Sequence, residues 1–109
     1  MDHQTDRLWV YCTTSSLEEA RHIGKILVAN KLAACVNILP QMQSIYQWQG
    51  KIEEGQETVL IAKTTTQCWS KLKDVIIENH SYECPCVVAL PIVDGHSDFL
   101  DWIGKETKY

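Results

Sequence analysis

Two cysteines separated by one proline, Cys84-Pro85-Cys86, are the residues of this chain best suited to bind a soft metal ion. On an extended chain their side chains face the same way, about 6.5–7 Å apart at the backbone, and a modest bend at Pro85 would bring the thiols together. Thiolates select copper(I) or zinc. His80, Glu83 or a neighbouring subunit would have to complete such a site. The alternative is two half-buried thiols at the start of a strand.

A lysine in an apolar setting is the second candidate. Lys63 lies on the same face of a predicted strand as Val59 and Ile61, and a buried lysine is costly unless it is paired. Glu83 is the obvious counter-charge. The alternative is a structural ion pair that fixes the assembly of subunits. Because no nucleophile–base set accompanies the lysine, we expect a protein that is not an enzyme.

Length and composition predict one globular domain over residues 1–109, with its core at about 8–103. The chain is 45% hydrophobic and 22% charged, and its net charge is −4. Lysine and arginine do not cluster, which disfavours nucleic acid as a partner. No segment approaches the roughly 18 apolar residues that span a bilayer, so we expect no membrane. The polar start and five scattered cysteines favour reduced thiols in the cytoplasm.

The hydrophobic pattern predicts alternating strands and helices. Ser16 and Glu19 fit a capping box, and the prolines at 40 and 91 indicate an edge or a bulge. Phe99, Leu100, Trp102 and Ile103 are expected to pack inward from the last helix. The predicted elements are a strand over 7–14, a helix over 16–30, a strand over 33–39 that resumes at 44–48, a turn at 49–51, a strand over 52–64, a helix from 65 or 66 that ends before 84, a strand over 86–93, a short helix capped by Ser97, and a frayed tail over 106–109.

This order predicts an α+β fold, the ferredoxin-like βαββαβ sandwich with a long hairpin and a short C-terminal helix. Both large helices then cover the same face of an antiparallel sheet. The strands over 33–39 and 59–63 are apolar on both faces. A second copy of the chain is therefore expected to cover the other face.

Several motifs, in order along the chain, resemble the divalent-ion tolerance (CutA) family. The resemblance runs from about Leu8 to Ile103. It implies a tight homotrimer in which long hairpin arms pair around a threefold axis. It also implies a link to tolerance of copper and other divalent ions, without established turnover. The motifs are Leu32-Ala33-Ala34-Cys35-Val36-Asn37, Tyr46-x-Trp48-x-Gly50-Lys51-Ile52, Glu53-Glu54, Glu57, Leu60-Ile61-x-Lys63-Thr64 and His80-x-Tyr82-Glu83-x-Pro85.

The resemblance also implies metal ligands. The residues that match the copper ligands proposed for relatives are Cys12, at the end of the first strand, and His80. The alternative is a core thiol and a histidine favoured by the helix dipole. The usual family motif is His-Pro-Tyr-Glu-x-Pro-Glu. Here Ser81 replaces the first proline, which predicts a less rigid exit from the second helix, and Cys86 replaces the second glutamate, whose role cannot be carried over.

In relatives, the positions of Trp48, Lys63, Tyr82 and Glu83 lie near one another in a cleft between subunits. The resemblance therefore implies a polar pocket of these four residues that holds a small anion or effector. Two functions follow. The first is a non-enzymatic, trimeric protein that binds copper, or another divalent ion such as zinc, in metal tolerance. The alternative is a signalling trimer similar to the nitrogen-regulatory PII proteins, although the chain has no long glycine-rich loop for phosphates.

Overall fold

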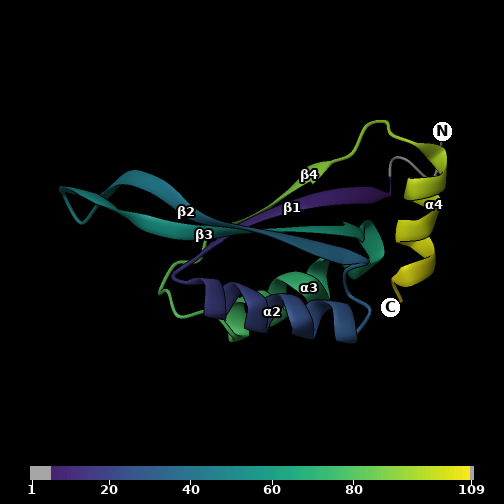
Figure 1. Cartoon of the computed structure of the whole chain (residues 1–109), viewed down its shortest axis with the longest axis horizontal. Helices are drawn as coiled ribbons and strands as arrows, with labels where there is room; N and C mark the ends of the chain where they lie inside the picture. Colours follow the sequence, from purple (N-terminus) through teal and green to yellow (C-terminus); the bar gives the residue numbers. More distant parts are fainter. Residues whose placement is uncertain (1–5, 109) are drawn as a thin grey trace.

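A four-stranded antiparallel sheet with two helices packed on one face forms the centre of this protein (Figure 1). The computed structural model describes residues 6–108, so most of the polar start lies outside the described residues. The strands lie in the order β2-β3-β1-β4. The predicted α+β, ferredoxin-like order is confirmed. The elements are β1 (Arg7–Thr14), α2 (Leu17–Ala29), β2 (Cys35–Trp48), β3 (Lys51–Thr65), α3 (Thr66–Glu78), β4 (Val87–Pro91) and α4 (Ser97–Glu106).

The core lies between the sheet and helices α2 and α3. Val10 and Cys12 of β1 alternate with outward-facing neighbours, and both are fully buried. Ile23 of α2 and Leu72 of α3 pack in the same cluster. A second, smaller cluster of Ala34, Leu100 and Ile103 seats α4 at one end of the sheet. Between residues 6 and 108, no helix is long and apolar enough to cross a membrane.

The sheet face opposite α2 and α3, called the open face below, is covered only in part. Trp9 and Tyr11 stack there with ring centroids 6.4 Å apart. Large apolar side chains on this face and on the hairpin beyond it are exposed, which is unusual for a chain that functions alone. They include Leu39, Ile45, Tyr46, Trp48, Ile52, Val88 and Leu90.

The β2–β3 hairpin is longer and more continuous than the sequence indicated. Residues 40–43 were expected to interrupt it, but β2 continues through them. The ladder absorbs Pro40 in a bulge between Leu39 and Met42, where Gln41 takes a φ of 64°. A two-residue turn at Gln49-Gly50, both at positive φ, closes the hairpin. Residues 42–57, called the arm below, extend beyond the helices and make the molecule 45 Å long (Figure 1).

The helix caps follow the sequence only in part. Glu19 N donates to Ser16 Oγ at 3.0 Å, as the capping box predicts. In a capping box the glutamate side chain accepts from the backbone N–H of the N-cap residue, here Ser16. Instead, the Glu19 carboxylate accepts from the preceding residue, Ser15 N. In the last helix, Ser97 is the first helical residue rather than the cap, and His96 takes the cap position without a side-chain capping hydrogen bond.

The prediction that the last helix packs four apolar residues inward is half right. Leu100 and Ile103 are buried, but Phe99 and Trp102 are about 40% exposed and stack on each other 5.7 Å apart. The ten-residue helix α4 packs against the end of the sheet with one face only, and Leu100 and Ile103 are the buried residues of that face. The tail after α4 is anchored rather than frayed, because Lys108 N donates to Lys31 O at 2.8 Å.

The contact between α2 and the sheet leads to a stability prediction. A Cβ at Gly24 would lie 2.8 Å from Val36 Cγ2. We expect Gly24→Ala to lower the free energy of unfolding by about 1 kcal/mol, because overpacking costs ~1–3 kcal/mol and exceeds the helix-propensity gain. Urea denaturation measures the change. Gly55→Ala is the matched control, since nothing lies within 4 Å of its Cβ. Equal stability of the two variants would contradict the close packing.

Candidate functional site

A cavity of about 750 Å³ opens between the base of the arm and the loop that follows α3. We call it the hollow. It brings together segments that are far apart in the sequence: β1, both strands of the arm and the Tyr82–Cys86 loop. The lining residues are Tyr11, Thr13, Met42, Gln43, Ser44, Ile45, Tyr46, Trp48, Glu57, Tyr82, Glu83, Cys84 and Cys86.

The Glu57 carboxylate on β3 links the neighbouring strand β2 to the Tyr82–Cys86 loop. Tyr82 OH donates to Glu57 Oε2 at 2.8 Å, and Ser44 Oγ donates to Oε1 at 2.5 Å. Burial raises the pKa of Tyr82, and the bond to Glu57 raises it further, so the phenol stays protonated and remains a donor. Tyr11 OH donates to the Met42 sulfur at 3.4 Å. These bonds hold the Tyr82 loop against the arm.

Both cysteines of the Cys84-Pro85-Cys86 motif line the hollow and are exposed. Cys86 precedes Val87, which pairs with Cys12 across the β1–β4 ladder. The Cys86 side chain therefore lies on the opposite sheet face from Cys12. Thr13 N donates to Cys86 O at 3.3 Å, which fixes the backbone of this position. Both thiols are thus accessible to an ion that enters the hollow.

Among residues 6–108, no group of three or more histidine, cysteine, aspartate or glutamate side chains is arranged to hold a metal ion. The thiol pair on its own therefore falls short of a complete coordination shell. A methionine thioether, a residue of another subunit or a movement of the loop would have to supply the remaining ligands.

The His80 ring is engaged through both nitrogens. Nε2 lies 2.7 Å from Thr13 O, and Nδ1 accepts from Tyr82 N at 3.1 Å. Since a carbonyl accepts only, these contacts assign the proton to Nε2. The ring also packs against Tyr82 at 4.7 Å. His80 fastens the loop to β1, and a metal ion would have to displace one of these bonds.

Cys12 points into the helix-facing core and is fully buried. Burial is the main reason that its pKa rises to about 12, and the nearby Cys86 thiol adds to the shift. A thiol with this pKa is protonated at neutral pH and is a poor metal ligand. Neither Cys12 nor His80 lines the hollow. Copper binding by this pair stays a prediction.

Lys63 lies apart from the other three predicted pocket residues within one protomer. It pairs with Trp9 and Cys35 in the sheet, and its Nζ donates to Asn37 Oδ1. Trp48, Tyr82 and Glu83 line the hollow, but Lys63 does not. Lys63 lies on the open face, on the same side of β3 as Val59 and Ile61, as the alternation along the strand predicted. A pairing of Lys63 with Glu83 of another subunit stays a prediction.

Glu19 fastens the Tyr82 loop from the other side. Its Oε1 accepts from Ser15 N and Ser15 Oγ, both at 2.9 Å, and its Oε2 accepts from Ser81 N at 2.8 Å. Burial opposes ionisation of Glu19, but these hydrogen bonds outweigh it and lower the pKa. A proline at position 81 has no N–H to donate. The hydrogen bond from Ser81 N to Glu19 therefore restrains this part of the loop, where the family motif has the rigid ring of a proline.

Sequence reasoning missed Met42 and Glu57 as residues of the hollow. The two face each other across the ladder beyond the bulge. The expected break over residues 40–43 hid this register. Counting back from the two-residue turn at Gln49-Gly50 along an unbroken arm would have paired Met42 with Glu57 and placed Ser44 on the same side.

Comparison with protein families gives a match over residues 8–106 to the family described as CutA1 divalent ion tolerance protein. The chain is 49% identical over 98 residues to the "Divalent-cation tolerance protein CutA" of Thermus thermophilus, covering 90% of this chain and 95% of that protein. It is 38% identical over 99 residues to "Protein CutA, chloroplastic" of Arabidopsis thaliana, covering 91% of this chain and 54% of that protein.

Solved structures show the same fold. The "Divalent cation tolerance protein (Cut A1)" of Thermus thermophilus superposes with a TM-score of 0.91 at 47% identity, covering 94% of this chain and 99% of that one. The structure titled "Periplasmic divalent cation tolerance protein CutA" of Archaeoglobus fulgidus has a TM-score of 0.90 at 43% identity, with the same coverage.

The Glu19 contacts lead to a prediction about pH. Because its pKa is lowered on folding, Glu19 stabilises the fold above its unfolded pKa of about 4.3, and this stabilisation is lost as the pH falls below that value. We expect Glu19→Gln to lower the free energy of unfolding by about 1 kcal/mol at pH 7 and to flatten the stability profile between pH 5 and 3.

Urea titrations at several pH values measure this effect. Glu18→Gln removes the same charge from the neighbouring, exposed position and serves as the control. If both variants lose equal stability, or if the Glu19 variant keeps the full pH dependence, the carboxylate does not fasten the loop.

Proposed function

Because the chain belongs to the CutA1 divalent ion tolerance protein family, we propose that it acts in tolerance of divalent metal ions by binding them directly, without catalytic turnover. The exposed Cys84 and Cys86 thiols at the hollow carry this proposal. The relatives' names refer to divalent cations in general. The choice of metal and of ligands is ours.

Copper, with zinc as the second choice, fits the donors that line the hollow. Two thiols and the Met42 thioether are soft ligands, which select copper(I) over magnesium or calcium. The Glu57 and Glu83 carboxylates add negative charge, which attracts any cation. Cys84 and Cys86 are exposed and accessible to ions in solvent, whereas Cys12 is buried.

Assembly as a homotrimer is the second part of the proposal. It is supported by the arm, which extends away from the helices and carries Ile45 and Ile52 about 70% exposed. Ile45 and Ile52 lie on one face of the arm and the exposed Tyr46 and Trp48 on the other, and apolar side chains on both faces of an exposed hairpin favour association with another copy. Neighbouring subunits would cover the open face and bring further side chains, Lys63 among them, to each hollow.

The alternative, a small anionic effector in the hollow, gains no support from the lining of one protomer. The hollow contains Glu57 and Glu83, and no lysine or arginine is among its lining residues. An anion there would face two carboxylates. A signalling role through this site therefore requires cations from a neighbouring subunit.

We propose the cytoplasm as the compartment, because five thiols without a disulfide suit a reducing environment. Two relatives have names that place them elsewhere: the Arabidopsis protein in the chloroplast and the Archaeoglobus protein in the periplasm.

The thiol proposal predicts the effect of one double variant. We expect Cys84→Ser/Cys86→Ser to lower copper(I) affinity at least tenfold, since even loss of an outer-shell group typically costs about 10–100-fold. Anaerobic competition against a chromophoric copper(I) chelator measures this affinity.

Cys35→Ser is the control for the thiol experiment, because Cys35 is a half-buried thiol outside the hollow. Unchanged affinity of the double variant would refute the assignment. If Cys12→Ser or His80→Ala lowers the affinity instead, the pair implied by the family resemblance is the metal site.

The assembly proposal predicts a mass three times 12.5 kDa in light scattering. We expect Ile45→Lys/Ile52→Lys to shift the protein towards the monomer mass, because charges on the arm oppose its burial. Val93→Lys is the control, since Val93 is 82% exposed and lies outside the arm. A wild-type mass of 12.5 kDa would rule out the trimer.

A further inference from the structure

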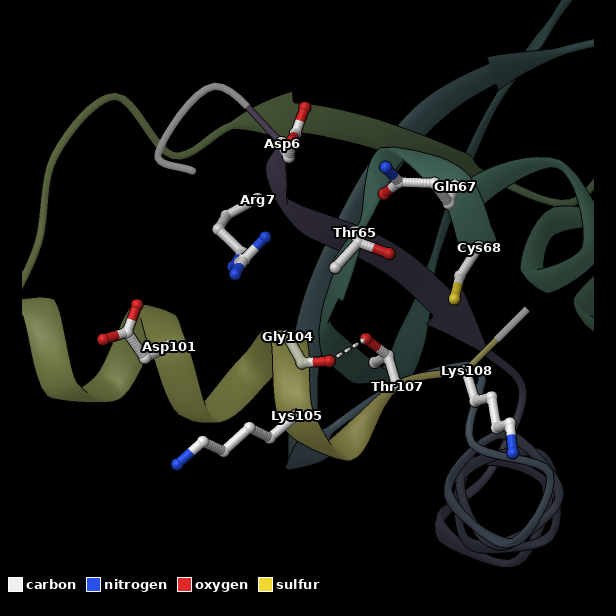
Figure 2. Close-up of a pocket in the computed structure, with 10 residues that line it drawn as sticks. All are labelled: Asp6, Arg7, Thr65, Gln67, Cys68, Asp101, Gly104, Lys105, Thr107 and Lys108. Carbon is white, nitrogen blue, oxygen red and sulfur yellow. Dashed lines mark hydrogen bonds between the residues drawn. The ribbon is translucent and has the colours of Figure 1, made fainter. Parts of the chain in front are cut away.

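A second cavity, of about 670 Å³, lies where the start of β1 meets the start of α3 and the end of α4 (Figure 2). It is separate from the hollow, which is lined by Tyr11 and Thr13 towards the other end of β1. The sequence had predicted no site here. Its lining differs from that of the hollow because it includes an arginine and two lysines.

The most informative residue of this cavity is Arg7. Its side chain extends from β1 towards α4 (Figure 2), and only 9% of the residue is exposed. Nε donates to Leu100 O at 2.7 Å. Among the described residues, 6–108, the Arg7 side chain makes no further hydrogen bond and no ion pair. The terminal nitrogens thus keep donors for a further acceptor.

An arginine in this position is costly without an anion. The guanidinium is always charged, and a buried charge is stable only when it is paired and hydrogen-bonded. One neutral carbonyl satisfies one of its five N–H groups. Arg7 itself lines a cavity wide enough for a small molecule.

The neighbouring helix leaves room for the guanidinium. A Cβ at Gly104 would collide with Arg7 Nη2. Glycine lowers helix stability by about 1 kcal/mol relative to alanine, so its presence within α4 has a physical reason here. The backbone around the cavity is also fixed, because Thr66 N donates to Asp6 O and Lys108 N donates to Lys31 O.

The charges of the lining favour an anion. Arg7, Lys105 and Lys108 supply three positive charges, whereas Asp6 and Asp101 supply two negative ones. The local excess is positive on a chain whose net charge is −4. The two lysine side chains are exposed and extend away from Arg7 in Figure 2, so their flexible stems are available to turn towards a ligand.

We propose that this cavity binds a phosphate group, either free phosphate or the phosphate of a small metabolite. Arg7 Nη1 and Nη2 donate to two phosphate oxygens, because the planar fork of a guanidinium matches that geometry. Lys105 and Lys108 neutralise the remaining charge. The inference is independent of metal binding in the hollow.

Phosphate titration followed by NMR of the intact, 15N-labelled protein tests this proposal. We expect saturable shifts at the amides of residues 65–68 and 104–108 with inorganic phosphate, and none with sodium chloride at equal ionic strength. A parallel titration with a ribonucleoside monophosphate distinguishes free from metabolite-borne phosphate, because the tighter ligand indicates the source.

Two variants assign the binding to these residues. We expect Lys105→Ala/Lys108→Ala to weaken binding about tenfold, since charge-assisted hydrogen bonds are lost, whereas Lys71→Ala/Lys73→Ala on α3 removes the same charge and leaves binding unchanged. Arg7→Lys keeps the charge but not the fork, and should also weaken binding. The proposal is overturned if phosphate causes no shifts, or if sodium chloride causes the same shifts. It is also overturned if phosphate still causes the shifts in both the Lys105→Ala/Lys108→Ala and the Arg7→Lys variants.

Discussion

The structure depends on one constraint: β3 must form hydrogen bonds with a strand on each of its two edges, while helices cover only one face of the sheet. β3 pairs with β1 through residues 58–65 and with β2 through almost its whole length. Successive side chains of this strand therefore point alternately into the helix-covered core and onto the incompletely covered open face. The positions of the hollow, the arm and Lys63 all follow from this arrangement.

The hollow exists because the β2–β3 pairing continues past the end of the other two strands. The bulge at Pro40 re-aims the arm, and the register beyond it brings Met42 and Glu57 together. Glu57 then holds Tyr82, and Glu19 holds Ser81. The loop that carries the two exposed thiols is thus fastened from both sides, so the thiols are presented from a defined backbone.

Burial separates the cysteines into two chemical classes. Cys12 faces the helices and is kept protonated by the low-dielectric core. Cys84 and Cys86 lie outside the core and keep access to ions in solvent. The two ends of the sheet also differ in charge: the hollow has carboxylates and thiols without a lysine or arginine, and the cavity at Arg7 has three cationic side chains beside two carboxylates. The lining charges therefore favour a cation in the hollow and an anion in the cavity at Arg7.

By itself, the sequence determined the order of the elements, the shared helix-covered face and the family. Period-2 and period-3.6 patterns, the Ser16 cap and the Gln49-Gly50 turn are local signals, and local sterics and hydrogen bonding decide them. Only the tertiary structure decided which residues share a cavity. That result depends on strand register and on side-chain partners distant in sequence: Lys63 bonds Asn37 rather than joining Trp48 and Tyr82, His80 bonds Thr13, and Arg7 meets Gly104. A one-residue bulge at Pro40 shifts every partner beyond it; the proline indicated an edge or a bulge, but not by how many residues the ladder is shifted.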